Sequence, residues 1–187
     1  AVLMVKSGGS NAYSNYAYSK IKTKRGTLLM GTALGACFAV DDYFNCMTLG
    51  SVMRPISDKH GISHSKLSYL IHSSAAPFCI IAPVSSWSAA IAGYLDGGII
   101  SFFKTIPMNL YAILAIAMVV CTSVLGIDFF KMKKDEKIAR ETGDLDAGET
   151  DLPVESIKAV PNEKGRVYHL IIPVILLIVC CIGSMLY

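Results

Sequence analysis

Apolar residues in this chain are gathered into long blocks, and nearly all of the charge lies in three short patches and one long loop. Two blocks contain no Lys, Arg, Asp or Glu and are long enough to cross a bilayer as one helix, which takes roughly 20 residues. They are residues 107–127 and 167–187. Pro173 lies inside the second block and would kink it. The pattern predicts two transmembrane helices.

Two other apolar blocks are interrupted. Segment 67–95 contains Pro77, Pro83 and the run Ser-Ser-Trp-Ser that starts at Ser85. Because proline removes a backbone donor and clashes with the preceding turn, this segment is predicted to be a broken transmembrane helix. Irregular backbone at membrane depth is tolerated where protein or a water-filled cavity satisfies it.

Segment 27–53 is broken by charge rather than by proline. A short apolar run ends at Val40, Asp41-Asp42 follows, and a second short apolar run reaches Met53. The segment either spans once as an interrupted helix or enters the membrane and returns as a re-entrant hairpin.

The charges of the loops distinguish these two alternatives, because short basic loops lie on the cytoplasmic side. Basic residues precede segment 27–53, follow it in loop 54–66, and recur at the start of loop 128–166. The connection 96–106 contains a single basic residue, Lys104, and is therefore expected to be external. The basic loops all lie on one side only if segment 27–53 does not cross. A re-entrant hairpin with its tip at Asp41 to Asn45 is therefore favoured.

The composition agrees with a membrane protein. Hydrophobic residues make up 53% of the chain and charged residues 17%, with a mean hydropathy of +0.50. A globular domain usually carries about 25% charged residues. The predicted fold is an all-α, polytopic helical membrane protein with a re-entrant hairpin and a broken transmembrane helix. Residues 1–26 are interpreted as the end of a membrane segment plus a loop, and 128–166 as a solvated cytoplasmic connector with room for a short helix over 131–141.

Asp41 and Asp42 are the candidate chemical centre. A charge at membrane depth costs about 3 kcal/mol on insertion scales, so an adjacent pair needs a cation or protons to neutralise it. Asn45 and Thr48 add neutral oxygens within about a turn, and freed carbonyls and half-helix ends supply the rest in many secondary transporters. The alternative is that the pair caps the following helix, or that one aspartate is a cap and the other is functional.

A cluster of serines flanks the prolines of the broken segment: Ser73, Ser74, Ser85 and Ser86. Their hydroxyls would complete an ion site opposite the hairpin tip. Alternatively, they pack helices together through small-residue contacts. His72 precedes the cluster and either titrates near neutral pH or is a packed or interfacial histidine.

These residues carry a resemblance to a known family. The run DDYFNCMTLGSVMRPISD at 41–58, followed by SSAAPFCIIAPVSSW at 73–87, resembles the core of the NhaC-type sodium/proton antiporters of the ion-transporter superfamily. SGGSNAY at 7–13 and KIKTKRG at 20–26 fit the same pattern, and the resemblance covers residues 1–130.

The resemblance implies an elevator-type transporter, usually a homodimer, with two inverted repeats that each hold a re-entrant hairpin and a broken helix. Na⁺ would bind at Asp41, Asp42 and Asn45, with the residues from Ser73 to Ser86 on the other side of the site. Such transporters have more spans than this chain. We therefore expect a C-terminal-half fragment, partnered by the remaining repeat.

The leading hypothesis is a secondary active transporter of the cell membrane that exchanges Na⁺ for H⁺, with both ions as cargo and no cofactor. One alternative is a sodium- or proton-coupled exchanger of small organic or amino acids on the same scaffold. Another is a structural or interaction membrane protein. An aspartyl protease would need a second aspartate on a facing helix, which the apolar segments lack, so no enzymatic activity is expected. The expected partner is the lipid bilayer, and not nucleic acid, because the net charge of +3 is small and dispersed.

Overall fold

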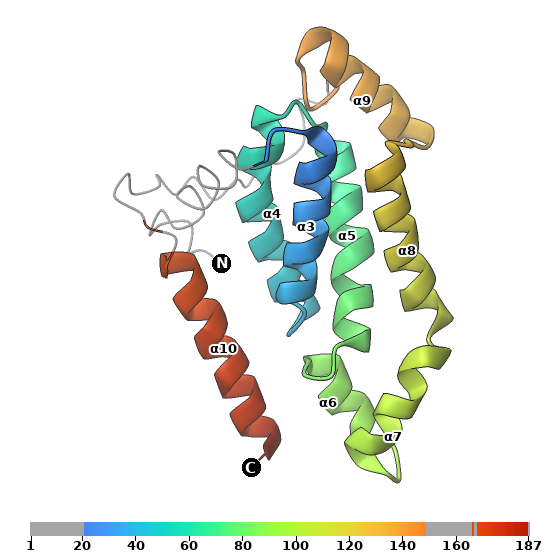
Figure 1. The fold of residues 1–187 in the computed structure, drawn as a ribbon, viewed down its shortest axis with the longest axis vertical. Helices are drawn as coiled ribbons and strands as arrows, with labels where there is room; N and C mark the ends of the chain where they lie inside the picture. The colour runs from blue at the N-terminus through green and yellow to red at the C-terminus, as the bar shows by residue number, and fades with distance from the viewer. Residues whose placement is uncertain (1–20, 149–165, 167, 187) are drawn as a thin grey trace.

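The computed structural model describes residues 21–148, 166 and 168–186, and the regular structure in this part of the chain is helical (Figure 1). The all-α prediction is confirmed for these residues. The SGGSNAY motif and most of the predicted segment 1–26 lie outside them. The helices are α3 (Lys24–Cys37), α4 (Asp42–Lys59), α5 (His64–Ile81), α6 (Ser86–Ala92), α7 (Gly98–Thr105), the 3₁₀ turn η1 (Ile106–Met108), α8 (Leu110–Leu125), α9 (Phe130–Thr142) and α10 (Tyr168–Leu186).

Helices α3 and α4 form an antiparallel hairpin. Thr23 caps the start of α3, where its hydroxyl accepts a hydrogen bond from the Gly26 amide at 3.1 Å. The chain turns at residues 38–41 and returns along α4 to the end of the molecule where it started, next to α9 (Figure 1). Helix α4 continues through Pro55 to Lys59, so the predicted loop 54–66 is helical over most of its first half. The insertion of this hairpin in a membrane stays a prediction.

The predicted broken segment 67–95 is divided between α5 and α6, which are bent by 42° relative to each other. The break follows Ile81, and α5 passes through Pro77 without interruption. A helix survives a single proline at the loss of one backbone hydrogen bond. Beyond Pro83, the Ser85 side chain caps a new helix by accepting from the Ser88 amide, and this cap fixes where α6 begins.

Helix α8 occupies the predicted span 107–127 but is shorter. Asn109 caps its start by accepting from the Ala112 amide at 3.1 Å, and it ends at Gly126, which has a left-handed φ of 68°. Within the described residues, the stretch Leu110–Thr142 is long and apolar enough to cross a membrane, and α5 with α6 qualifies as a bent pair. Helix α10 contributes a shorter apolar stretch, Ile171–Cys180.

Helix α9 lies across the end of the bundle at which the hairpin opens (Figure 1). The inner face of α9 is buried: Met132, Asp135, Glu136 and Ala139. The short helix that the sequence allowed over 131–141 is therefore present as α9, with one face packed against the bundle and most of its other residues exposed. Two of these four buried residues are acidic. The sequence of α9 therefore lacks the regular spacing of apolar residues that normally reveals a buried helix face.

The core of the bundle lies between α3, α4, α5 and α8. Leu49, Met53 and Ile56 of α4 are at most 1% exposed and follow the spacing of a helical stripe. Gly31 of α3 lets the helices approach closely, because a Cβ there would lie 3.1 Å from Met53 Cε and 3.2 Å from Leu70 Cδ2. This packing holds the hairpin tip in a fixed position against α5.

Candidate functional site

The hairpin tip is built around Asp41, the N-cap of α4. Its Oδ1 accepts a hydrogen bond from the Phe44 amide at 2.9 Å. Its Oδ2 accepts from the Ser86 hydroxyl at 3.1 Å. Asp41 therefore caps α4, which was one of the two roles that the sequence left open. Both of its carboxylate oxygens accept hydrogen bonds. Asp42 is half-buried in the first turn of α4, one position further along.

Ser86 joins the broken segment to the hairpin tip. Besides its side-chain bond to Asp41, its backbone amide donates to the Val40 carbonyl at 2.8 Å. The start of α6 is thereby fixed against the turn between α3 and α4. The structure thus brings the break and the tip together, which is the arrangement that the sequence predicted for these two motifs.

Asn45 and Thr48 are buried one turn apart on α4, and both are 0% exposed. Asn45 Nδ2 donates to the Gly35 carbonyl of α3 at 2.8 Å. This bond sets the orientation of the amide, because a flipped amide would place two acceptor oxygens against each other. Asn45 Oδ1 and Thr48 Oγ1 accept no regular hydrogen bond among the described residues, and the Asn45 side chain lies against the buried Cys79 thiol of α5.

Two neighbouring buried oxygens without partners need an explanation, because buried polar atoms are nearly always paired. Leaving one such group unsatisfied costs about 1–3 kcal/mol. A bound cation is one group that would use such oxygens as ligands. The structure therefore singles out Asn45 and Thr48 among the residues that the sequence proposed.

The serines of the broken segment have different surroundings. Ser74 is buried and donates to the Leu70 carbonyl at 2.7 Å. Its Oγ would lie 3.4 Å from a Cβ on Gly35, so it borders the backbone that Asn45 contacts. Ser85 donates to the Cys79 carbonyl at 2.7 Å and belongs to the α6 cap, which makes its first role structural.

Ser73 and Asp42 line a cavity of about 580 Å³ between α4, α5 and α8. The other residues of its wall were not proposed as site residues: Tyr43, Cys46, Tyr69, His72, Ala76, Tyr111, Ala115 and Met118. The three tyrosines come from three helices, so no local pattern in the sequence groups them. His72 was noted in the sequence, and the structure places it in the same wall as Asp42.

No group of three or more His, Cys, Asp or Glu side chains that would hold a metal ion is found among the described residues. A cation at Asn45 and Thr48 would be held mainly by neutral oxygens and by helix ends, with a carboxylate nearby. Such a donor set suits an ion that must bind and leave again, as transported cargo does.

A second polar cluster lies at the opposite end of the hairpin, where Glu136 of α9 receives two hydrogen bonds. Lys24 Nζ donates to its Oε1 at 3.1 Å and the Ser63 amide donates to its Oε2 at 3.0 Å. Burial alone would raise the pKa of Glu136, but the Ser63 amide and the Lys24 ammonium outweigh it and hold the pKa below its ordinary value. Lys66 pairs with Asp128 at 2.5 Å beside them. These bonds fasten α9 to the base of the hairpin.

The chain is similar to an uncharacterized protein of Haemophilus influenzae, with 32% identity over 197 aligned residues. The alignment covers 99% of this chain and 36% of that protein, so the chain spans about a third of the length of the relative that it matches. No protein-family profile and no solved structure matches the chain.

Proposed function

We propose that the chain is part of a secondary active transporter that exchanges Na⁺ for H⁺ across the cell membrane. The observation that carries this proposal is the pair of buried oxygens without a hydrogen bond on Asn45 and Thr48, which follow Asp42 on α4 by three and six residues. A sodium ion bound there would satisfy both oxygens. The nearby carboxylate would balance its charge.

The surrounding backbone supports a cation site. The C-terminal ends of α3 and α5 and the N-terminal ends of α4 and α6 come together at the hairpin tip (Figure 1). Helix C-termini carry partial negative charge and helix N-termini partial positive charge. Meeting half-helix ends are the usual setting for coupled ions in secondary transporters. Exchange would follow if the carboxylate of Asp42 takes a proton when the sodium ion leaves.

The membrane location rests on the apolar surface. Much of α8 exposes large apolar side chains, with Leu110 at 65%, Leu114 at 65% and Leu125 at 59% exposed. Soluble monomers rarely expose contiguous apolar patches of more than a few hundred Å². Lipid, or the remaining repeat of the transporter, would cover this face. The resemblance to NhaC-type antiporters favours the same setting, with the hairpin entering from the cytoplasmic side.

The test uses the natural full-length protein that carries these residues, purified and reconstituted into sealed vesicles. A sodium gradient should drive proton flux, and Asp42→Asn should reduce that flux by about tenfold or more, because the carboxylate is the proposed proton carrier. Asp96→Asn, in the turn before α7, is the matched control and should leave the flux unchanged. Equal flux in Asp42→Asn and the unaltered protein would refute the role of this carboxylate.

A second candidate function is favoured by the size of the cavity. A volume of about 580 Å³ lies within the range of small-molecule sites and is far larger than a bare sodium ion needs. With Asp42, His72 and Tyr111 in its wall, the cavity suits a small polar organic substrate, such as an amino acid with a free ammonium group. Sodium uptake that requires an added organic substrate would select this exchanger over Na⁺/H⁺ exchange.

A further inference from the structure

Helix α9 separates its acidic residues from its basic ones. Two of its acids, Asp135 and Glu136, are each 3% exposed, and they accept hydrogen bonds from Ser65 and Lys24 of the bundle. The basic residues of the helix are all exposed: Lys131, Lys133, Lys134, Lys137 and Arg140. Glu141 is the acid that remains exposed. The outer surface of α9 is therefore strongly positive, although its sequence mixes both charges.

Three of the basic residues form a stripe along one side of α9. Lys133, Lys137 and Arg140 are separated by four and then three residues, which places them on one face of a helix. Lys137 pairs with Glu141 at 3.8 Å, and both side chains are too solvated for this pair to be strong. The side chains of Lys133 and Arg140 form no ion pair within the part of the chain that the structure describes.

Two acids that follow α9 have partners of their own. Asp146 pairs with His64 at 2.6 Å. The Asp144 carboxylate accepts hydrogen bonds from the amides of Asp146 at 3.0 Å and Gly148 at 2.8 Å. The stripe therefore presents its positive charge outward, where an anion from outside the chain would be attracted to it.

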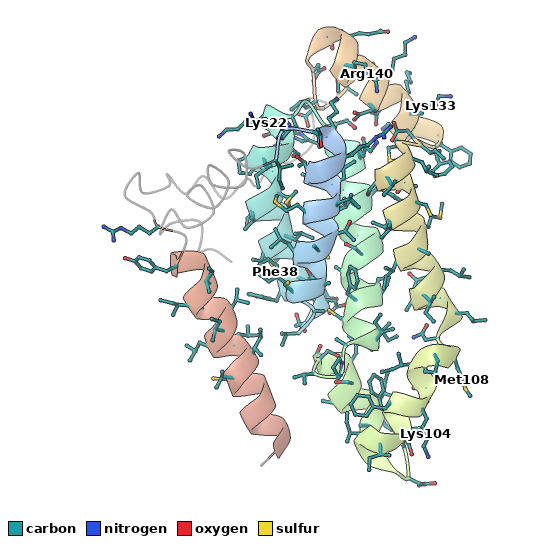
Figure 2. The ribbon with its side chains drawn as sticks, viewed as in Figure 1. Lys22, Phe38, Lys104, Met108, Lys133 and Arg140 are labelled. Carbon is teal, nitrogen blue, oxygen red and sulfur yellow. The ribbon has the colours of Figure 1, made fainter. Side chains whose placement is uncertain are left out.

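The junction between α8 and α9 indicates the depth at which the stripe would lie in a membrane. Helix α8 has 16 residues, or roughly 24 Å, and the hydrocarbon core is about 30 Å thick. Its exposed apolar face therefore ends near the edge of that core. Figure 2 shows Lys133 beside this junction, which places the start of the stripe at the level of the lipid headgroups.

Phe130, the first residue of α9, is an exposed aromatic residue at the same level. Its side chain is 97% exposed, and its φ of 43° is left-handed, a conformation that bulky residues rarely adopt. Phe129 before it is 38% exposed. Aromatic and basic side chains together are typical of helices that lie in a membrane interface. An acidic soluble protein would match the charge of the stripe, but it would give the Phe130 ring no apolar surroundings.

We propose that this side of α9 binds the headgroups of anionic phospholipids in the cytoplasmic leaflet. Lys133, Lys137 and Arg140 contact the phosphates, and the Phe130 ring lies among the upper parts of the acyl chains. Basic segments directly after a transmembrane helix are attracted to anionic lipids, and their long side chains extend to the headgroup level. This inference rests on the membrane location that belongs to the proposed function. It adds a lipid partner and leaves the ion site as described.

The test measures lipid binding by the natural full-length protein, purified in a neutral detergent. Native mass spectrometry should show that phosphatidylglycerol is retained in preference to phosphatidylcholine, and that added salt reduces this preference. Replacing two charges of the stripe, by Lys133→Gln with Arg140→Gln, should weaken phosphatidylglycerol binding by roughly thirtyfold, about fivefold for each charge. Equal retention of the two lipids by the unaltered protein would overturn the proposal.

The matched control removes two charges from other places. Lys104→Gln with Lys134→Gln alters α7 and a different side of α9, and this variant should bind phosphatidylglycerol as the unaltered protein does. All four replaced side chains are exposed, so both double variants should fold, which thermal unfolding checks. Equal losses of binding in the two double variants would show an effect of net charge and would refute the stripe.

Phe130→Asn distinguishes a lipid surface from a site for free phosphate. Asparagine tolerates a left-handed φ, so this variant removes the ring without straining the start of α9. It should weaken phosphatidylglycerol binding by roughly tenfold, because the ring loses its burial in lipid. If inorganic phosphate displaces phosphatidylglycerol and Phe130→Asn binds the lipid normally, the stripe is a simple anion site and the proposal fails.

The lipid surface and the exchange function can fail separately. If phosphatidylglycerol binds as expected but reconstituted vesicles show no sodium-driven proton flux, the exchange function fails and the lipid surface stands. If flux occurs and Lys133→Gln with Arg140→Gln retains phosphatidylglycerol as the unaltered protein does, the lipid surface fails and the exchange function stands.

Discussion

Thr32 and Thr48 are buried threonines on the two arms of the same hairpin, and they differ in their hydroxyl partners. The Thr32 hydroxyl donates to the Leu28 carbonyl at 3.1 Å, whereas the Thr48 hydroxyl has no partner among the described residues. If Thr48 is kept for the cation rather than for the fold, replacing it with the isosteric valine should affect sodium binding and stability in opposite directions.

Thr48→Val should raise the sodium concentration for half-maximal exchange by roughly tenfold, which is the loss of about 1.4 kcal/mol of binding. In the absence of sodium it should leave the free energy of unfolding unchanged or raise it by about 1 kcal/mol, because it removes an unsatisfied buried group. Sodium-dependent flux and thermal unfolding in detergent measure the two effects.

Thr32→Val is the control for this comparison. It should lower the stability by about 1 kcal/mol, through the lost hydrogen bond, and leave the sodium dependence as it is. A Thr48→Val protein with reduced stability and unaltered sodium dependence would show that the hydroxyl serves the fold.

At the scale of single residues, the sequence proposed Asp41, Asp42, Asn45 and Thr48 as one site, and in the structure these residues follow one another at the start of α4. It left their roles open, because a cap and a ligand use the same residue types at the same spacing. The roles become distinct only through partners from other helices. The Gly35 carbonyl engages Asn45 Nδ2, and Ser86 engages the second oxygen of Asp41.

At the scale of a single helix, α9 contains two glutamates that each pair with a lysine, one buried and one exposed. Glu136 is 4% exposed at its side chain and pairs with Lys24, which is 39% exposed. Glu141 pairs with Lys137 at 3.8 Å, and both side chains are more than half exposed. Glu136→Gln should lower the free energy of unfolding by about 1–2 kcal/mol, less than for a fully buried pair, because Lys24 is partly solvated. Glu141→Gln should change it by less than about 0.5 kcal/mol.

The effect of Glu136→Gln should also depend on pH. The pKa of Glu136 lies below its ordinary value of 4.5 in the folded protein. Its charged form therefore stabilises the fold above pH 4.5, and this contribution is lost as the pH falls through the lower, folded-state pKa. The stability difference between the unaltered protein and Glu136→Gln should be full at pH 7 and smaller near pH 3. Thermal unfolding at both values measures it, and a difference independent of pH would contradict the ionic role.

The same element shows why part of the fold was not predictable. An apolar period predicts the core stripe of α4, and proline with serine predicts the break between α5 and α6. The inner face of α9 instead contains two acids, and their burial is favourable only because Lys24, Ser63 and Ser65 meet them there. These partners are far from α9 in the sequence, so the local pattern indicated a solvated loop.

The lengths of the hairpin arms bear on the topology of the whole molecule. Helix α3 has 14 residues and α4 has 18, which at about 1.5 Å per residue gives roughly 21 Å and 27 Å. A hydrocarbon core is about 30 Å thick, so neither arm reaches across it unaided. Because Lys24 at the start of α3 bonds to the Gly61 carbonyl beyond the end of α4, both ends of the hairpin lie together. The expected topology has the hairpin entering and leaving on the side of α9.

Lysines at the two ends of the molecule provide the test. Lys22 and Lys133 lie at the α9 end, and Lys104 lies at the opposite end (Figure 2). All three side chains are exposed, so a membrane-impermeant amine reagent should reach them from the aqueous phase. In inside-out vesicles Lys22 and Lys133 should both react, and Lys104 should stay protected. In right-side-out vesicles Lys104 should react and the other two lysines should stay protected. Mass spectrometry of the peptides identifies the lysines that have reacted. Permeabilised vesicles, in which all three should react, are the control. If Lys22 reacted with Lys104 instead, segment 27–53 would have to cross the membrane, and Asp41 to Asn45 would no longer lie at the tip of a re-entrant hairpin.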